Sequence, residues 1–440
     1  MNPQLAPGIP QRLAVAALFG AIFTVHLLYI FVVQMPERQV RLRGKKIVFQ
    51  GLRLYDDEDQ YLLIAHHLYQ AGTLSLDGQH PTGQRVPLYP LALAGTFAVS
   101  AGLTPALGLN CLLAALAALL AYALARLFWS PGVGLAAMAA VGFSPHSFNW
   151  FLWMQAEALL SVFILGFLVA FLKLLRTGRR LFALICGLLA GLASLTRPET
   201  VLLVPLYLAV LGYYCVRRRR PWLRPGLVLA AGAILVLTPW LGRNYLVLAS
   251  PSLSTLGGFT FAGAHNDKAG KHPGSWYAFM AYAEPGELAE VDKLSEPAQD
   301  RYLWQRGIKW LRDQNLKDLA VLEMHKLHRT FKPSFRFWGK EFGRETLHLL
   351  LIIPFTLLFL AGVTVGLMRQ CLDRDPDRRD QFLALWLVFL IPLAVTLIFW
   401  GSARFRAPYE PVAFALSVGC LVDIYESWQK KRAVGKVPAT

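Results

Sequence analysis

The stretch LAVAALFGAIFTVHLLYIFVV, residues 13–33, decides the fold class of this chain. It runs for 21 residues without a charged side chain. An α-helix rises 1.5 Å per residue, so about 20 apolar residues cross the roughly 30 Å hydrocarbon core of a bilayer. A large apolar body follows the stretch, and no small-residue cleavage site does. We therefore expect a retained transmembrane helix, not a cleaved signal.

Apolar runs of this length recur along all 440 residues, of which 55% are hydrophobic and 16% charged. So little charge cannot cover a soluble surface of this size, and lipid must cover much of it. The pattern predicts an all-α polytopic membrane protein with about ten transmembrane helices. The predicted spans are 13–34, 105–128, 132–146, 157–175, 181–197, 199–216, 226–242, 346–368, 381–400 and 408–426.

Clusters of basic residues indicate the orientation of these spans, because short cytoplasmic loops are enriched in Lys and Arg. The rule places both termini inside if the apolar segment 87–102 does not cross, so we expect a re-entrant or interfacial helix there on the periplasmic side. The first loop is itself basic, but long loops obey the rule weakly. The clusters that fix the orientation are Arg126, 173–180, 217–224, 369–379 and 430–432.

The spans divide the chain into three parts. Residues 1–242 form an N-terminal membrane module whose first periplasmic loop, 34–104, is long enough to carry a site. Residues 243–345 form a second periplasmic region with an amphipathic helix over 298–330, which we expect to lie along the membrane surface. Residues 346–440 hold the C-terminal transmembrane helices.

Several classes of function do not fit the composition. The net charge of +17 comes from basic residues at helix ends, which indicates membrane anchoring and not nucleic-acid binding. The five cysteines show neither CxxC spacing nor histidine partners, so neither a disulfide framework nor a zinc site is predicted. No phosphate-binding glycine motif is present in the sequence, which argues against a nucleotide-bound donor.

Four successive acids, 56–59, follow Tyr55 at the start of a predicted amphipathic helix in the first loop. Acids at a helix N-terminus are favoured by the macrodipole, but capping alone needs one or two of them. We therefore expect at least one of these carboxylates to act in catalysis at the membrane surface.

From this loop onward the sequence resembles the GT-C superfamily glycosyltransferases, in particular the bacterial protein O-mannosyltransferases and the lipid A aminoarabinose transferases. The motifs that carry the resemblance extend over nearly the whole chain in the same order and spacing. They are Asp57-Glu58 with Tyr61, then Arg85-Val-Pro-Leu-Tyr-Pro, Ser144-Pro145, Glu157-Ala-Leu-Leu, 187–198, 238–244 and 401–408.

The resemblance implies a GT-C-like bundle with periplasmic juxtamembrane helices. It also implies transfer of a sugar from a polyprenyl-phosphate carrier to a periplasmic or lipid acceptor at a bacterial inner membrane. The catalytic base falls on Asp57, with Asp56 as its competitor. The acceptor must lose a proton as it attacks, and a single base with direct displacement inverts the anomeric centre.

The departing carrier phosphate needs positive charge more than a general acid. Five arginines map to periplasmic ends or loops, where the positive-inside rule disfavours them, although interfacial snorkelling would explain any single one. The resemblance places Arg85 on the donor phosphate, with Arg404 or Arg406 next. The other two arginines are Arg197 and Arg243. Gln60 stands where the aminoarabinose transferase has Arg, so that enzyme's substrate specificity is not carried over.

Other residues complete the predicted site. Glu157 is either a second catalytic carboxylate or an acid that stabilises the start of its helix. Glu199 is a natural ion-pair partner of Arg197. Substrate contacts are expected from residues of the first loop and of a glycine-rich loop, namely Asp56, Glu58, Tyr61, His265 and Asn266. No cofactor is implied with certainty; the clustered acids leave room for a divalent metal.

Other functions remain open at this point. A lipid-linked oligosaccharide ligase or polymerase would share the donor class and the periplasmic site. A secondary transporter would place its charges near the bilayer midplane and often show inverted repeats. The expected partners are a polyprenyl-phosphate sugar donor, membrane lipids, and a lipid, glycan or protein acceptor.

Overall fold

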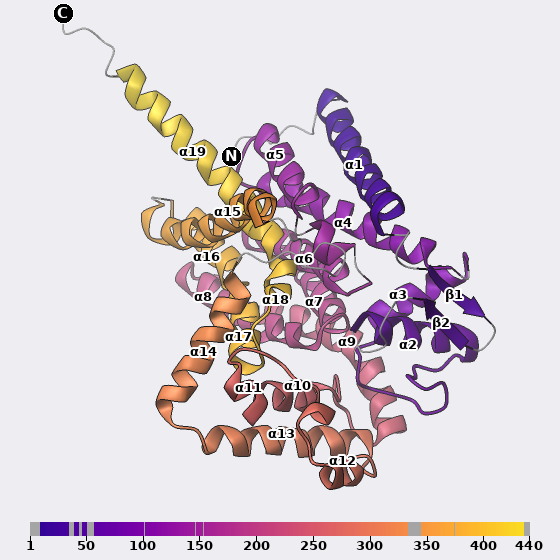
Figure 1. The fold of residues 1–440 in the computed structure, drawn as a ribbon. Helices are drawn as coiled ribbons and strands as arrows, with labels where there is room; N and C mark the ends of the chain where they lie inside the picture. The colour runs from indigo at the N-terminus through magenta and orange to yellow at the C-terminus, as the bar shows by residue number, and fades with distance from the viewer. Residues whose placement is uncertain are drawn as a thin grey trace, which may run out of the picture.

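The computed structural model describes residues 9–34, 39–43, 46–50, 57–100, 102–145, 147–152, 154–332, 345–373 and 375–434. Nearly all of the described chain is helical, and the predicted all-α polytopic class is confirmed (Figure 1). A bundle of long helices forms one body, and short helices of the two loop regions gather at one side of it.

Within the described residues, eight helices or runs of abutting helices are long and apolar enough to cross a membrane. Each of the ten predicted spans falls on a helix, but α5 (Pro131–Gly142) and α7 (Arg180–Ser194) have only 12 and 15 residues. The chain is therefore a multi-pass membrane protein. Five of the eight lie in the first part of the chain: Ile9–Val32 (α1, Ile9–Tyr29, with a π-helical turn at Ile30–Gln34), Thr104–Ala125 (α4), Glu157–Thr177 (α6), Pro198–Arg217 (a 3-10 turn, Pro198–Leu202, and α8, Leu203–Arg217) and Leu223–Leu248 (α9). The other three follow the second loop region. They are Ile352–Arg369 (within α15, Glu345–Leu372), Pro376–Ile398 (α16, Pro376–Leu387, and α17, Leu390–Ile398) and Ala403–Gln429 (α18, Ala403–Arg406, a 3-10 turn at Ala407–Tyr409, and α19, Glu410–Val434).

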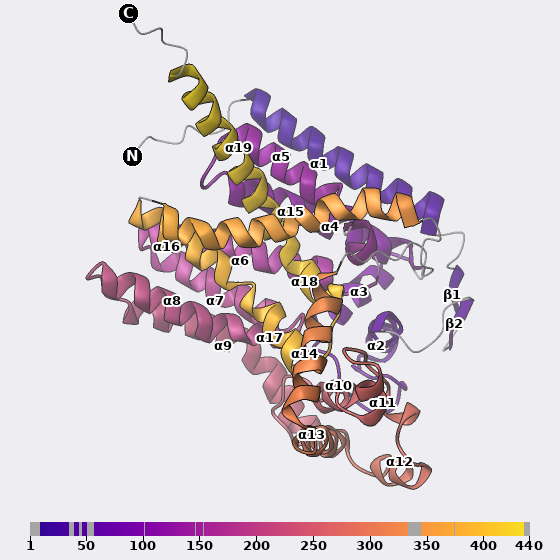
Figure 2. The same cartoon turned by 60° about the vertical axis from the view of Figure 1, so that its left-hand side comes forward.

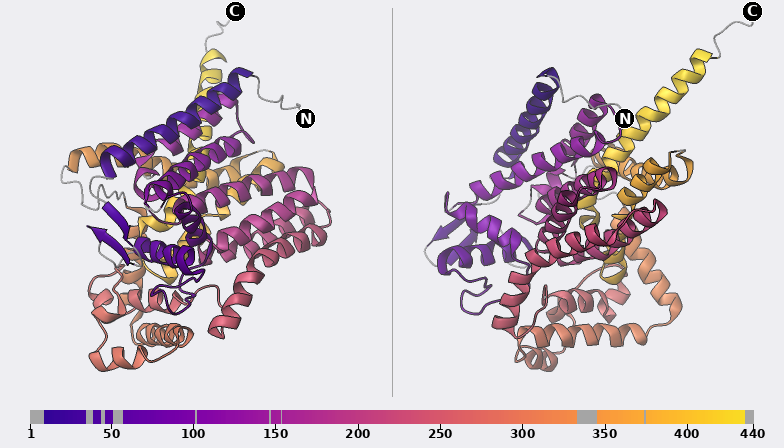
Figure 3. Two further views of the ribbon diagram at one scale, coloured as in Figure 1. Left: turned by 90° about the vertical axis from the view of Figure 1, so that its right-hand side faces the viewer. Right: turned by 180° about the vertical axis from the view of Figure 1, so that it is seen from behind.

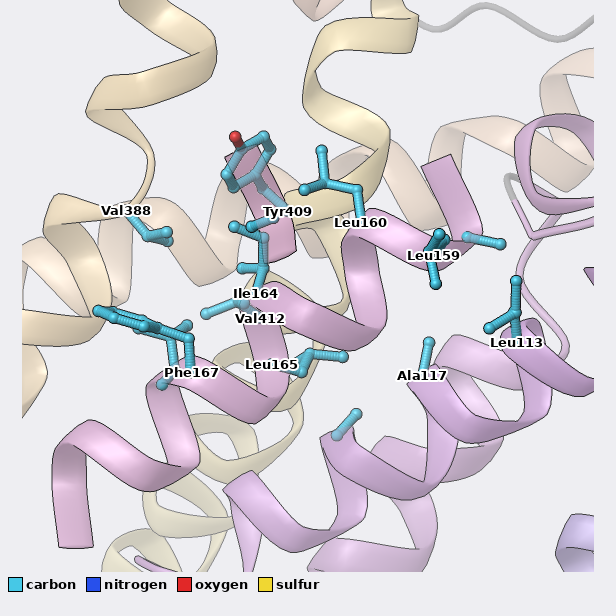
Figure 4. Packing of buried hydrophobic residues seen from close by; sticks show 14 of the residues in the cluster. Leu113, Ala117, Leu159, Leu160, Ile164, Leu165, Phe167, Val388, Tyr409 and Val412 are labelled. Carbon is cyan, nitrogen blue, oxygen red and sulfur yellow. The ribbon is translucent and has the colours of Figure 1, made fainter. Parts of the chain in front are cut away.

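Helix α6 is the centre of the bundle. Figure 4 shows its side chains Leu160, Ile164 and Phe167 packed against Val388 and Tyr409 from the C-terminal spans, while neighbouring α6 leucines face α4. Because apolar side chains cover α6 on several sides, both its ends are held in fixed positions. Figure 3 shows α1 on the outside of this core, beside α4 and α5.

Glycines allow two helix pairs to approach closely. A Cβ built on Gly187 of α7 would lie 2.1 Å from the carbonyl oxygen of Leu229 in α9, so only glycine fits there. In the same way, a Cβ on Gly362 of α15 would lie 2.1 Å from the carbonyl oxygen of Ala413 in α19. Small residues at such crossings increase backbone contact, which drives helix association where lipid gives no hydrophobic force.

The first loop contains two helices and an antiparallel hairpin. The hairpin, β1 (Gln39–Arg43) and β2 (Lys46–Gln50), was not predicted. Helix α2 (Asp57–Ala71) packs on α3 (Leu88–Phe97), where the rings of Tyr61 and Tyr89 meet edge to face at 5.1 Å. With 10 residues, α3 is too short to cross the bilayer, as expected for segment 87–102.

The second loop region is a cluster of short helices at the lower edge of Figure 1. The single helix predicted over 298–330 is wrong: the chain turns between α13 and α14, and Asn315 caps α14 by accepting from the amide of Asp318 at 2.9 Å. Figure 2 shows α14 running across the direction of α15. The elements are α10 (Gly257–Ala264), α11 (Asp267–Lys271), a 3-10 turn (Phe279–Ala281), α12 (Pro285–Val291), α13 (Glu296–Arg312) and α14 (Leu316–Phe331).

Candidate active site

A buried carboxylate joins three segments of the chain. Glu157, the first residue of α6, is 0% exposed, and its Oε1 accepts a hydrogen bond from Nη1 of Arg197 at 2.9 Å. Nε of Arg404 donates to the same oxygen. Arg197 also pairs through Nε with Glu199 at 2.6 Å, as the sequence suggested. Two arginines and two acids from three distant segments of the chain therefore form one polar cluster.

The neighbouring backbone holds this cluster against the first loop. Arg197 lies in the link between α7 and the 3-10 turn that precedes α8, and its guanidinium stands over the ring of Phe405 at 5.6 Å. The amide of Leu88, at the start of α3, donates to the carbonyl oxygen of Leu195 at 2.9 Å. The first loop is thus tied to the chain two residues before Arg197.

One oxygen of the cluster lacks a partner. Oε2 of Glu157 is buried and has no hydrogen-bond partner among the residues that the structure describes. A buried acceptor without a donor costs free energy, so such an atom is either hydrated or complemented by a ligand donor. Glu157 therefore both fixes the two arginines and presents an acceptor in the same place.

Arg85 is fixed beside the first turns of α2. Its Nε donates to Oε1 of Gln60 at 2.9 Å, and its guanidinium lies 5.2 Å from the ring centre of Tyr61. Tyr61 is buried, so it serves as a platform for the arginine. Helix α2 begins at Asp57, which places the backbone of Asp57 and Glu58 in the turn that precedes Gln60. Asp56 lies outside the described residues.

Arg243 is directed at the protein itself. Its Nη1 donates to the carbonyl oxygen of Thr82 at 2.7 Å and to Oδ1 of Asn244 at 2.8 Å. The ring of Trp240 lies 5.1 Å from its guanidinium. In this arrangement Arg243 holds the segment that leads to Arg85, so its contribution is to position the first loop.

Glu296 holds the same segment from the second loop region, and sequence reasoning missed it. Its Oε2 accepts from Oγ1 of Thr82 at 2.7 Å, and its Oε1 accepts from the amide of Gly83 at 2.7 Å and from Thr255. Glu296 stands at the start of α13, where the helix dipole ordinarily favours an acid. Nothing in the sequence therefore indicated its contact with a residue 213 positions away.

Arg404 and Arg406 are separated by the structure. Arg406 is 0% exposed, and its Nε donates to Glu410 at 2.7 Å while its Nη1 donates to the carbonyl oxygen of Thr330 at 2.8 Å. It therefore joins α14 to α19. Nη2 of Arg406 is buried without a hydrogen-bond partner among the described residues, whereas Arg404 lies in the Glu157 cluster.

His265 and Asn266 are occupied by internal contacts. His265 is buried, and its Nδ1 lies 2.8 Å from the carbonyl oxygen of Phe261, while its Nε2 lies 3.0 Å from Nζ of Lys326. Burial and then the charge of Lys326 lower the pKa of His265 to about 3. Asn266 caps α11 by accepting from the amide of Ala269 at 2.9 Å. Both residues shape the second loop region.

Lys326 is a second residue whose contacts the sequence did not reveal. It is 0% exposed, and its ammonium donates to Glu323 at 2.7 Å and to the carbonyl oxygen of Leu397 at 3.0 Å. Burial lowers the pKa of Lys326. Because Leu397 lies in α17, this residue attaches the second loop region to the bundle.

The described side chains contain no group of three or more His, Cys, Asp or Glu that could hold a metal ion. The acids 56–59 fall outside that statement, since their side chains are not described. A divalent metal at these acids stays a prediction.

Residues 79–242 match a family model described as dolichyl-phosphate-mannose-protein mannosyltransferase. This segment contains Arg85, Glu157 and Arg197, and it covers less than half of the chain. No curated protein matches the chain.

Solved structures resemble the chain in fold. The oligosaccharyltransferase AglB from Archaeoglobus fulgidus, in complex with an inhibitory peptide and a dolichol-phosphate, matches with a TM-score of 0.50 and 14% identity over 96% of this chain and 52% of that one. The same archaeal enzyme tethered to an acceptor peptide gives 0.50 and 14% over 94% and 50%. ArnT from Cupriavidus metallidurans bound to undecaprenyl phosphate gives 0.40 and 15% over 92% and 76%.

The chain spans about half the length of the archaeal oligosaccharyltransferases that it matches. At this identity the likeness establishes the fold alone. By the sequence of residues 79–242 and by its fold, the chain resembles the GT-C superfamily glycosyltransferases, as its motifs predicted.

Proposed function

We propose that this protein is a membrane glycosyltransferase that moves a sugar from a polyprenyl-phosphate carrier to a lipid, glycan or protein acceptor. The observation that carries the proposal is the convergence of Arg197 and Arg404 on buried Glu157, in the part of the fold that the first loop contacts. Taking charged groups out of water is costly even when they are paired, so a largely buried cluster of this kind points to a functional role.

The cluster suits a phosphate as ligand. A guanidinium has five N–H donors, and the two ion pairs of Arg197 use only Nε and Nη1. The side chains of Arg197 and Arg404 are each 13% exposed, so water is largely excluded while some access remains. Charge-assisted hydrogen bonds to phosphate oxygens are strong in such surroundings.

The chemistry assigned to the first loop is a direct displacement. The carboxylate of Asp57 takes the proton of the acceptor hydroxyl or amine as the acceptor atom bonds to the anomeric carbon. The bond from that carbon to the carrier oxygen breaks, and its electron pair leaves with the polyprenyl phosphate. Arg85, Arg197 and Arg404 stabilise the negative charge that collects there. One base and one displacement give inversion.

The orientation follows from the two ends of α6. Glu157 opens this helix, and Arg176 lies in its last turn, near the basic segment that follows α8. The positive-inside rule places that second end in the cytoplasm, which directs the Glu157 cluster toward the periplasm of a bacterial inner membrane.

Thiol labelling tests the orientation without any substrate. In a Cys371→Ser background the remaining cysteines are buried. A cysteine at exposed Lys271 should react with an impermeant reagent in spheroplasts, and one at exposed Arg219 should react only after lysis. The reverse pattern would move the site to the cytoplasm.

The activity itself is tested with the purified full-length protein and synthetic polyprenyl-phosphate hexose or pentose donors. Release of free polyprenyl phosphate, with a matching mass gain on envelope glycolipids or glycoproteins, is the expected result. A mass gain of many sugar units from a lipid-linked oligosaccharide would indicate a ligase instead. Transfer from a nucleotide sugar but not from any polyprenyl-phosphate donor would overturn the proposal.

A further inference from the structure

A second site lies at the opposite end of α6 from Glu157. A cavity of about 550 Å³ is bordered by the last turns of α6 and α8 and by the start of α9. Helix α6 has 21 residues, so this cavity is separated from the Glu157 cluster by roughly 30 Å along the helix axis. It is therefore distinct from the candidate active site.

The lining of the cavity is apolar on its walls and basic at its rim. The walls include Leu174 and Leu175 of α6, Leu211 of α8 and Leu223 of α9. Among the described residues, the charged side chains that line the cavity are three arginines, Arg180, Arg220 and Arg224, and no acid. Such a combination fits a molecule with an anionic head and a hydrocarbon tail.

Two acids at this end of the bundle, Asp377 and Asp380, pair with arginines that do not line the cavity. Arg218 donates to Oδ2 of Asp380 at 2.7 Å and also pairs with Asp377, and Arg217 lies 3.6 Å from Oδ1 of Asp380. By contrast, the structure assigns no ion pair within the described chain to the three cavity arginines. Their charge is therefore available to an external anion.

Two helix N-termini add to this charge. Helix α7 begins at Arg180 and α9 begins at Leu223, and neither has an acid in its first turn or a side-chain cap. The positive ends of both helix dipoles and their unpaired amides thus border the cavity without internal compensation. Anions bind readily where such ends coincide with arginines.

The backbone at the end of α8 fixes Arg220 at the rim. Arg219 adopts a left-handed conformation with φ 53°, which allows the amide of Arg220 to donate to the carbonyl oxygen of Cys215 at 2.8 Å. Glycine is the usual residue in this position of a helix terminus. The chain instead keeps a third consecutive arginine there, and Pro221 follows.

We propose that this cavity binds one anionic phospholipid, with its phosphate at Arg180, Arg220 and Arg224 and an acyl chain along the leucine walls. A soluble anion would use the arginines but not the leucines, which face the cavity at the ends of membrane spans. General attraction between basic helix ends and lipid headgroups would not distinguish the arginines that line the cavity from neighbouring arginines that do not.

The test uses the full-length protein in detergent, titrated with dioleoyl phosphatidylglycerol and followed by native mass spectrometry. One lipid should remain bound, and dioleoyl phosphatidylcholine should bind much more weakly. The double variant R220Q/R224Q should lower the apparent affinity about 10- to 30-fold. Leu223→Trp, which fills the apolar wall and keeps every charge, should also weaken retention.

The matched control is R179Q/R219Q, which removes two arginines that neighbour the cavity arginines in sequence but do not line the cavity. It should change the affinity by less than about 3-fold. An equal loss of lipid affinity in both double variants would show that the lipid is held by general attraction to the basic surface and not by the cavity. Displacement of the lipid by millimolar inorganic phosphate, with Leu223→Trp unaffected, would identify a soluble anion and overturn the assignment. Unchanged unfolding temperatures check that all variants remain folded.

Discussion

Glu157 and Arg197 form a buried ion pair across 40 residues of sequence, with Oε1 and Nη1 2.9 Å apart. The pair connects the start of α6 to the link after α7. Because Arg404 donates to the same oxygen, Glu157 joins two arginines that come from distant segments of the chain. The cluster must therefore assemble as the spans pack together.

Removing this carboxylate should destabilise the protein. Glu157→Ala leaves two largely buried arginines with too little negative charge, which should cost about 3–5 kcal/mol of unfolding free energy. Glu199→Ala is the matched control, because Glu199 is more exposed and, within the described part of the chain, pairs with Arg197 alone; its cost should be smaller. Thermal unfolding in detergent measures both. Equal unfolding temperatures for the two variants would show that Arg404 does not depend on Glu157.

Asp57→Asn should leave folding and donor binding intact and remove sugar transfer. The amide keeps the shape of the side chain and loses its ability to accept a proton. A loss of at least about 100-fold in kcat is expected. Asp56→Asn is the matched neighbour and should have much less effect. An inactive Asp56 variant together with an active Asp57 variant would show that Asp56 is the base. Normal turnover in both variants would rule out the proposed mechanism.

The sequence predicted the spans and the ion pair of Arg197 with Glu199 because their signals are local. Apolar run length identifies a span, and Glu199 stands two residues from its partner Arg197. It could not choose between Arg404 and Arg406, which lie two positions apart in one short helix and point to different neighbours. That choice depends on how α18 sits between α6 and α14.

The sequence also could not predict contacts between distant loops. Glu296 binds Gly83 across 213 residues, and Lys326 reaches His265 and α17 only after the second loop region has folded onto the bundle. Neither residue stands in a pattern that distinguishes it from a surface charge. The same reason explains why His265 and Asn266 read as substrate contacts, although the structure uses them internally.

The contact of Glu296 with the first loop can be measured directly. Glu296→Ala removes the acceptor of the Gly83 amide, so hydrogen exchange around Thr82 and Gly83 should accelerate by about 10-fold or more. Transfer should also slow, since Arg85 lies two residues further on. Glu290→Ala, an exposed acid of α12, is the control and should change neither quantity. Unchanged exchange at Gly83 would mean that the other contacts hold the loop without Glu296.

His265 should make stability depend on pH. Its folded-state pKa is lowered from 6.5 to about 3 by burial and by Lys326. Below pH 6.5 the imidazole of His265 is protonated in the unfolded chain but stays neutral in the folded protein. The contribution of His265 to the free energy of unfolding is therefore fully present above pH 6.5 and is lost as the pH drops toward about 3. His265→Gln should flatten this part of the profile between about pH 5 and 7.

The control for this experiment is His328→Gln, because His328 lies exposed on the same helix as Lys326. The comparison separates the loss of the buried imidazole from the loss of a histidine side chain at the surface of the same region. Carboxylates titrate mostly below this window, so the difference between the two variants isolates His265. Identical slopes for the wild type and the His265 variant would contradict the buried neutral state.

Arg85 gives the sharpest test of the donor. It is held by Gln60 at 2.9 Å and stands over Tyr61, beside the helix that begins at Asp57. If it contacts the carrier phosphate, Arg85→Ala should weaken binding of the polyprenyl-phosphate sugar by about 1.5–3 kcal/mol, or roughly 10- to 150-fold. Transfer should slow as well, because the same contact stabilises the leaving phosphate.

Replacement by other residues separates charge from geometry at this position. Arg85→Lys should restore part of the activity as a point charge, whereas Arg85→Gln should not. Gln60→Ala removes one hydrogen-bond partner of Arg85 but keeps the charge, so it should have the smaller effect. Arg179→Ala, an exposed arginine at the start of α7, controls for the loss of one charge. Donor affinity and rate that stay normal in folded Arg85→Ala protein would leave Arg85 as an anchor of α2 and place the phosphate at Arg197 and Arg404 alone.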